Sequence, residues 1–124
     1  MIIRQEKDNS MAVQELIGVT GHAFIKELYS GPTWPAEPVM RYSLELLVIH
    51  PYSGDWAIYS EFVPHLSVAA VSSAVGCLQD RLVREDNICL RLLITESTPV
   101  FADQRFQNYL NRSNINHYCV PGEG

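Results

Sequence analysis

The sequence predicts an α/β domain in which helices pack on a mixed sheet. Two apolar runs separated by a turn predict an antiparallel hairpin. Two later apolar runs alternate with helical patterns, which predicts crossovers between parallel strands. A length of 124 residues with 47% hydrophobic and 19% charged residues suits one globular domain over residues 1–124.

The first element that the pattern predicts is a helix over residues 11–30, because its apolar residues fall on one broad helical face. We expect residues 9–31 to form an N-terminal helical extension. Gly18 and Gly21 weaken the middle of this helix. The proline-rich residues 31–38 then predict a loop or a short edge strand.

The later elements have clearer boundaries, because turn residues and a helix cap separate them. They are a strand at 41–50, a turn at 51–54, a strand at 55–62, a helix capped by Ser67 and ending near 84, a loop at 85–87, a strand at 88–95, a helix from 99 or 100 to 111, and a strand at 115–120. A weak strand and a hairpin followed by helix, strand, helix and strand is the element order of the ribonuclease H-like fold, here with an extra N-terminal helix.

The net charge of −5 argues against a surface that binds nucleic acid by itself, since neutralising phosphates needs clustered Lys and Arg. A protein partner fits this charge better. No apolar run reaches the length of a membrane span, and the N-terminus lacks the apolar core of a signal peptide. We therefore expect no membrane association and an intracellular location, in the cytoplasm or nucleus.

The other reactive side chains have structural interpretations. The cysteines (Cys77, Cys89 and Cys119) have no CxxC spacing and do not cluster with histidines, which favours buried reduced thiols over a zinc site. His50, at the end of a predicted strand, is interpreted as a hydrogen-bonded structural histidine. The two tryptophans are expected in the core or at an interface.

One carboxylate has a position of functional interest. Glu96 ends the apolar strand that precedes a turn and a helix, and α/β folds usually carry their chemistry at the carboxyl edge of a sheet. The surrounding ITESTPVF (residues 94–101) resembles the Thr-Asp-Asn-Gly-x-x-Phe block of the retroviral-type integrase catalytic core. Thr95 and Phe101 match that block, Glu96 stands at its catalytic aspartate, and Thr98 replaces its glycine.

Other segments are similar to the same family, in the same order. LVIHPYSGDWAIYSEFVP (47–64) resembles the integrase hairpin, and FQNYLNRSNINHYCVPG (106–122) resembles the helix, turn and final strand. Trp34-Pro35-Ala36-Glu37 resembles the Trp-x-x-Asp block, so Glu37 would stand at the first catalytic aspartate. The resemblance covers residues 33–122 and implies a ribonuclease H-like fold.

The family's chemistry is phosphoryl transfer on DNA, in which three carboxylates hold two divalent ions, Mg²⁺ or Mn²⁺. At the first two positions this chain has Glu37 and Glu96, which are one methylene longer than aspartate. The third carboxylate should lie on a helix after the last strand, and the sequence ends before that helix. Glu37 and Glu96 are therefore interpreted as a vestigial catalytic and metal-binding pair, and no cofactor is expected unless the site is active.

Three functions remain open from the sequence. The first is an inactive integrase-core-like domain that acts as a dimerisation or protein-interaction module; the resemblance implies a homodimer formed through helix faces. The second is an active metal-dependent DNA strand transferase or nuclease with Glu37 and Glu96 as ligands. The third is a small acidic inhibitor or immunity protein that masks a basic partner.

Overall fold

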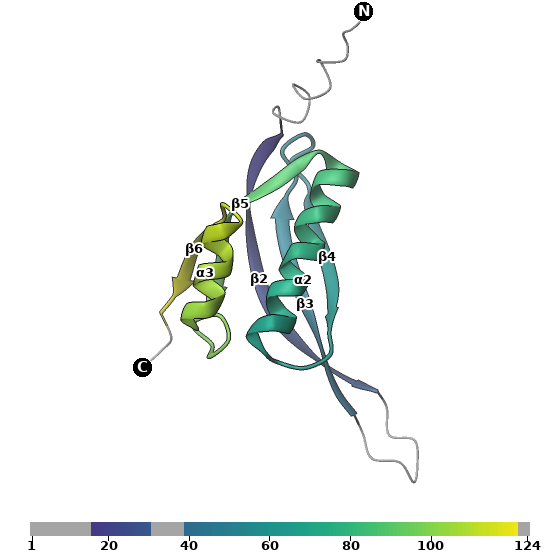
Figure 1. The fold of residues 1–124 in the computed structure, drawn as a ribbon. Helices are drawn as coiled ribbons and strands as arrows, with labels where there is room; N and C mark the ends of the chain where they lie inside the picture. The colour runs from purple at the N-terminus through teal and green to yellow at the C-terminus, as the bar shows by residue number, and fades with distance from the viewer. Residues whose placement is uncertain (1–15, 31–38, 122–124) are drawn as a thin grey trace, which may run out of the picture.

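The computed structural model describes residues 16–30 and 39–121, which form a five-stranded mixed sheet and two α-helices (Figure 1). The elements are β2 (Ile17–Ser30), β3 (Val39–Ile49), β4 (Trp56–Val63), α2 (Val68–Arg81), a short π-helix (Leu82–Asp86), β5 (Ile88–Glu96), α3 (Gln104–Arg112) and β6 (Asn116–Val120). The strand order across the sheet is β4-β3-β2-β5-β6. Strand β3 pairs antiparallel with β2 and β4, whereas β5 pairs parallel with β2 and β6. The predicted mixed sheet of the ribonuclease H-like fold is confirmed.

Strand β2 overturns the prediction of an N-terminal helix over Ile17–Ser30. Its side chains alternate: Val19, Gly21 and Ala23 are buried, whereas the three residues between and after them are exposed. A period of two is that of a strand. Both edges of β2 are paired, by β3 and by β5, so neighbouring strands rather than a helical turn satisfy its backbone. The remaining residues of the predicted extension, 9–15, lie outside the described residues, as do residues 31–38.

Gly21 shows why β2 needs a small residue at the centre of the sheet. A Cβ added there would lie 2.5 Å from Cδ1 of Leu46 and 2.9 Å from Cδ1 of Leu90. The glycine that weakens a helix is therefore a packing requirement of the strand, because two core leucines close over its backbone.

Both helices cover the same face of the sheet (Figure 1). Ser67 caps α2 as predicted, with its Oγ accepting a hydrogen bond from Ala70 N at 3.1 Å. The core lies between the helices and the sheet, and its members include Leu44, Leu46, Val48, Val71, Val75, Leu78, Leu90, Leu93, Phe101, Phe106 and Leu110. This packing leaves the opposite face of the sheet uncovered by α2 and α3.

We call that opposite face the outer face. The paired registers place alternate residues of every strand on it: Thr20, His22, Phe24 and Lys26 from β2, Ser43, Glu45, Leu47 and Ile49 from β3, Trp56, Ile58, Ser60 and Phe62 from β4, Leu92, Ile94 and Glu96 from β5, and Asn116, Tyr118 and Val120 from β6.

Helix α3 begins at Gln104, later than the predicted residue 99 or 100. The intervening residues form a turn in which Ala102 N donates to the carbonyl of Thr98 at 2.8 Å. Asp103 caps the helix by accepting from Arg105 N at 2.8 Å. Hydrogen bonds from Arg105 hold the pKa of Asp103 down to about 2, so the cap is charged at neutral pH.

Two further details differ from the sequence analysis. Two residues of the predicted loop at 85–87 belong to the π-helix, which ends at Asp86 and is followed by Asn87 with a φ of 60°. The three cysteines are free, but Cys77 is exposed and Cys119 is only partly buried, so the prediction of a buried thiol is wrong at Cys77 and confirmed in full only at Cys89. Among the described residues, no helix is both long and apolar enough to cross a membrane.

Candidate functional site

The candidate site lies where β5 ends at the carboxyl edge of the sheet. Thr95 is buried toward the helices, so the next residue, Glu96, is exposed on the outer face. On one side β6 pairs Val120 with Glu96, and on the other β2 pairs His22 with Ile94. Together these strands enclose a hollow of about 200 Å³, lined by His22, Ala23, Phe24, Ile94, Thr95, Glu96 and Val120.

The hollow brings one carboxylate and one imidazole together. A carboxylate and a neutral imidazole are both metal ligands, but two-metal phosphoryl transfer needs several carboxylates around the ions. Phe24 lies on β2 two residues beyond His22, at the level of Glu96, and it contributes an apolar ring to the lining. In the described ranges 16–30 and 39–121, no three His, Cys, Asp or Glu residues are grouped so that they could hold a metal ion.

Of the two predicted site residues, the structure describes only Glu96. Glu96 lies at the sheet edge where the sequence places it. Glu37 lies outside the described residues, so its pairing with Glu96 stays a prediction. Sequence reasoning missed His22 and Phe24, because it assigned them to a helix. The alternation of Val19, Gly21 and Ala23 with Thr20 and His22 is a strand signal in the sequence, but it does not by itself place these residues beside Glu96.

Beneath Glu96, a chain of hydrogen bonds joins β5, β6 and α3. Gln107 Nε2 donates to the carbonyl of Phe101 at 2.8 Å, which leaves Gln107 Oε1 as an acceptor. His117 Nδ1 lies 2.8 Å from that oxygen and must therefore carry the proton. His117 Nε2 is then an acceptor, and Thr95 donates its hydroxyl to it at 2.7 Å. Burial lowers the pKa of His117, which favours this neutral tautomer.

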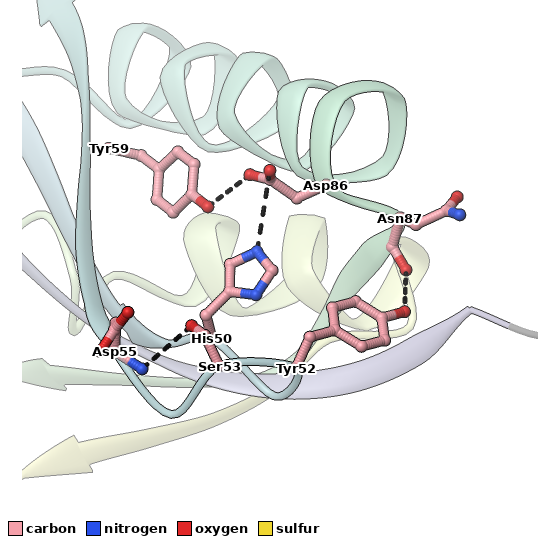
Figure 2. A network of polar contacts seen from close by, with 7 residues as sticks. All are labelled: His50, Tyr52, Ser53, Asp55, Tyr59, Asp86 and Asn87. Atoms are coloured by element: carbon pink, nitrogen blue, oxygen red, sulfur yellow. Dashed lines mark hydrogen bonds and ion pairs between the residues drawn. The ribbon is translucent and has the colours of Figure 1, made fainter.

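A second polar cluster lies at the other end of β5 (Figure 2). Tyr59 donates its hydroxyl to Oδ2 of Asp86 at 2.5 Å, and His50 Nε2 lies 3.7 Å from Oδ1 of the same carboxylate. Tyr52 reaches the carbonyl of Asn87 at 3.5 Å. Burial, followed by the hydrogen bond and charge of Asp86, raises the pKa of Tyr59 to about 12. These contacts tie the β3–β4 hairpin to the π-helix and fit the structural role expected of His50.

Sequence comparison finds no relative: no protein-family model matches the chain, and no curated protein does. Solved structures do match. A chain of the simian T-cell lymphotropic virus intasome in complex with PP2A regulatory subunit B56 gamma is 15% identical with a TM-score of 0.60, covering 85% of this chain and 32% of that chain. The HTLV-2 integrase catalytic core domain in complex with magnesium, in its dimeric form, is 13% identical with a TM-score of 0.55, covering 86% and 63%. The catalytic core domain of BIV integrase is 11% identical with a TM-score of 0.53, covering 82% and 53%.

These matches establish the fold, which is that of a retroviral integrase catalytic core. They confirm the resemblance and extend it to β2, which the sequence analysis had placed before the matching region. The chain spans about a third of the intasome chain and less than two thirds of the HTLV-2 core chain. At 11–15% identity the matches show the fold alone.

Proposed function

We propose that this chain is an integrase-core-like domain that performs no strand transfer and acts by self-association, as a dimerisation module. The observation that carries the proposal is the composition of the edge at Glu96. The strand beside β5 presents His22 and Phe24 there, where metal-dependent phosphoryl transfer needs carboxylates. Among the described residues, Glu96 is the one carboxylate that lines this hollow, and a single carboxylate does not hold a pair of ions. Its extra methylene also displaces the oxygens that an aspartate would present.

The oligomers seen for integrase cores of the same fold support the proposed self-association. The HTLV-2 integrase core has been solved in a dimeric form and in a trimeric form. A domain that has lost catalytic groups keeps its fold only if some other property is selected, and association through the core is the property that these relatives offer. The acidic charge of this chain also favours protein contacts over contacts with phosphates.

Light scattering coupled to size exclusion tests the association. We expect the chain to run at twice its monomer mass of 14.0 kDa at high micromolar concentration, and to dissociate on dilution. A monomer mass throughout the concentration range would contradict the proposed module.

A metal-dependent nuclease or strand transferase is the alternative, and one observation favours it: His22 and Glu96 line the same hollow. Calorimetric titration with Mn²⁺, together with cleavage of a labelled DNA duplex, separates the two functions. The proposal predicts no cleavage and the same result for wild type and Glu96→Gln. Cleavage that requires Mn²⁺ and disappears in Glu96→Gln, with Glu85→Gln as an unaffected surface control, would establish the enzyme instead.

A further inference from the structure

The outer face carries most of the large apolar side chains that the described residues expose. Ten large hydrophobic side chains in the described ranges are substantially exposed, and seven of them lie on this face. They are Phe24 (41%), Ile49 (48%), Trp56 (60%), Ile58 (61%), Phe62 (53%), Tyr118 (55%) and Val120 (39%). One row of paired residues, from Ile58 through Leu47, His22 and Ile94 to Tyr118, crosses all five strands, so the surface is continuous.

The area of this face matches what a stable dimer needs. A large side chain of this kind offers roughly 150–250 Å² when fully exposed, so seven that are about half exposed present on the order of 600 Å². Monomeric proteins rarely expose apolar patches beyond a few hundred Å² without a use for them. With a polar rim in the usual proportion, the buried area approaches the roughly 800 Å² per partner of a standard interface.

The outer face has both protruding side chains and hollows, so its shape suits contact with a second copy of itself. Trp56 and Ile58 protrude from the edge strand β4, and two hollows of about 260 and 200 Å³ lie beside His22. The larger hollow is bounded by Trp56, Leu47 and Ile49 on one side and by the small residues Gly18 and Thr20 on the other. An isologous interface requires projections and hollows on one and the same patch, because each copy supplies both.

Charge does little to oppose self-association through this face. Besides Lys26, Glu45 and Glu96, it carries Arg41, which alternates with Ser43 on β3, and Arg91, which lies against Gly18 on β2. The formal charge of these five side chains is +1 in a chain of −5, so two copies that meet through their outer faces bring little like charge together.

The carboxylate in the middle of the face is already satisfied. Ser43 and Ser60 both donate their hydroxyls to Glu45, the latter at 2.8 Å. Covering Glu45 with a partner therefore costs less than burying an unpaired carboxylate.

From these observations we infer that two copies of this chain associate through their outer faces, sheet against sheet, rather than through their helices. The inference rests on the proposed function and names the surface that it uses. It has a consequence for the site, because a second copy on the outer face covers His22 and Glu96 and closes this edge to nucleic acid.

Charge substitutions on the two sides of the sheet test the inference by sedimentation velocity. Ile58→Lys and Tyr118→Lys place a cation at opposite ends of the outer face, on side chains that are already 61% and 55% exposed. We expect each to raise the dimer Kd at least about tenfold, since an unpaired charge is then buried in the interface.

The matched control is Leu66→Lys, an exposed apolar residue beside Ile25 on the helix-covered side, which should leave the Kd unchanged. Ser73→Lys, on the exposed side of α2, should also leave it unchanged.

The outcomes separate the inference from the proposed function. A wild-type dimer that Ile58→Lys and Tyr118→Lys weaken supports both. A dimer that resists those changes and is broken by Ser73→Lys associates through its helices, which overturns the inference and leaves the proposed module intact. A wild-type chain that stays monomeric overturns both.

Tryptophan fluorescence provides a readout that needs no outer-face variant. In a Trp34→Phe background the emission reports Trp56 alone, because the chain has two tryptophans. Association through the outer face would remove the indole ring of Trp56 from water. Its emission should therefore shift to shorter wavelength as the protein concentration rises through the dimer Kd. An unshifted spectrum in a sample that sediments as a dimer would rule out this face.

Discussion

The hydroxyl of Tyr59 on β4 donates a hydrogen bond of 2.5 Å to the carboxylate of Asp86 in the π-helix (Figure 2). Tyr59 is only 8% exposed, so the pair forms where solvent competes weakly. The contact spans 27 residues of sequence and fixes the turn end of the β3–β4 hairpin against the element that leads into β5. This end of the sheet is therefore held by polar side chains as well as by the core.

Removing the Tyr59 hydroxyl should destabilise the domain. In Tyr59→Phe the carboxylate of Asp86 loses the donor at 2.5 Å, and its remaining side-chain partner among the described residues is His50, 3.7 Å away. Because hydrogen bonds to charged groups contribute more than neutral ones, we expect a loss of roughly 1.5–3 kcal/mol in the free energy of unfolding, measured by urea denaturation. Tyr52→Phe is the matched control: its hydroxyl makes an exposed 3.5 Å contact, and its loss should change stability by less than about 0.5 kcal/mol. Equal effects of the two changes would contradict this account.

The same pair predicts an alkaline limit to stability. The pKa of Tyr59 is raised by burial and by Asp86 to about 12 in the folded protein, above the ordinary tyrosine value of about 10. A raised pKa means that folding favours the protonated phenol. The resulting stability, up to roughly 2 kcal/mol, is present below pH 10 and is lost as the pH rises from about 10 to about 12. Urea denaturation across this interval should show the loss in wild type and a smaller loss in Tyr59→Phe. Phenolate absorbance should show one tyrosine that titrates late and is missing in the variant.

Two glycines on β2 should respond oppositely to the same change. At Gly21 a new Cβ would lie within 3 Å of two buried leucine methyls, those of Leu46 and Leu90, so Gly21→Ala should cost roughly 1–3 kcal/mol. At Gly18 the new Cβ meets only the side chain of Arg91, with Cγ nearest at 2.5 Å, and this exposed side chain can move aside. Gly18→Ala should therefore stay within about 0.5 kcal/mol of wild type or stabilise the strand. Thermal denaturation of the two variants measures the difference. A neutral Gly21→Ala would show that the core around Leu46 has room to relax.

The sequence predicts the elements whose patterns are local. The β3–β4 hairpin, the Ser67 cap and β5 each carry their own signal in turn residues, cap residues or alternation, and the structure has them within a few residues. Strand β2 differs because its apolar residues fit a helical face as well as a strand. The deciding contribution comes from pairing with β3 and with β5, and β5 begins far along the chain, at Ile88. Local patterns do not contain that information.

The residues of the candidate site were also predictable only where a local sequence pattern marks them. Glu96 was predictable, because the end of an apolar strand is visible in the sequence. Its neighbours His22 and Phe24 were not, since they reach it only through the parallel register of β2 against β5. The outer face was hidden for a related reason: an exposed Trp56 or Ile58 looks like a core residue until the side covered by the helices is known.

His117 should make the domain sensitive to acid. Burial lowers its pKa below the ordinary histidine value, so folding favours the neutral ring that bridges Thr95 and Gln107. The stability that this provides is present above about pH 6.5 and is lost as the pH falls below that value toward the lowered pKa. Thermal denaturation between neutral and mildly acid pH should show a steeper loss in wild type than in His117→Asn. The exposed His65→Asn should retain the wild-type slope. Nitrogen NMR at neutral pH should find the His117 proton on Nδ1. A proton on Nε2 would contradict the hydrogen bonds from Thr95 to His117 and from His117 to Gln107.

Replacing Phe24 with aspartate should create a metal site that the wild-type edge lacks. Residues 24 and 96 line the same hollow, two positions beyond His22 and Ile94, which are the last paired residues of β2 and β5. Two carboxylates in one hollow repel one another, so Phe24→Asp should be less stable without metal. They can also share one divalent ion with His22 close by, so millimolar Mn²⁺ should raise the melting temperature of the variant and leave wild type unchanged. Ile58→Asp, a more exposed position on the outer face away from Glu96, should gain nothing from Mn²⁺. If Mn²⁺ does not raise the melting temperature of Phe24→Asp either, the edge at Glu96 lacks the geometry of the metal site of an integrase core. The resemblance to integrase cores is then limited to the fold.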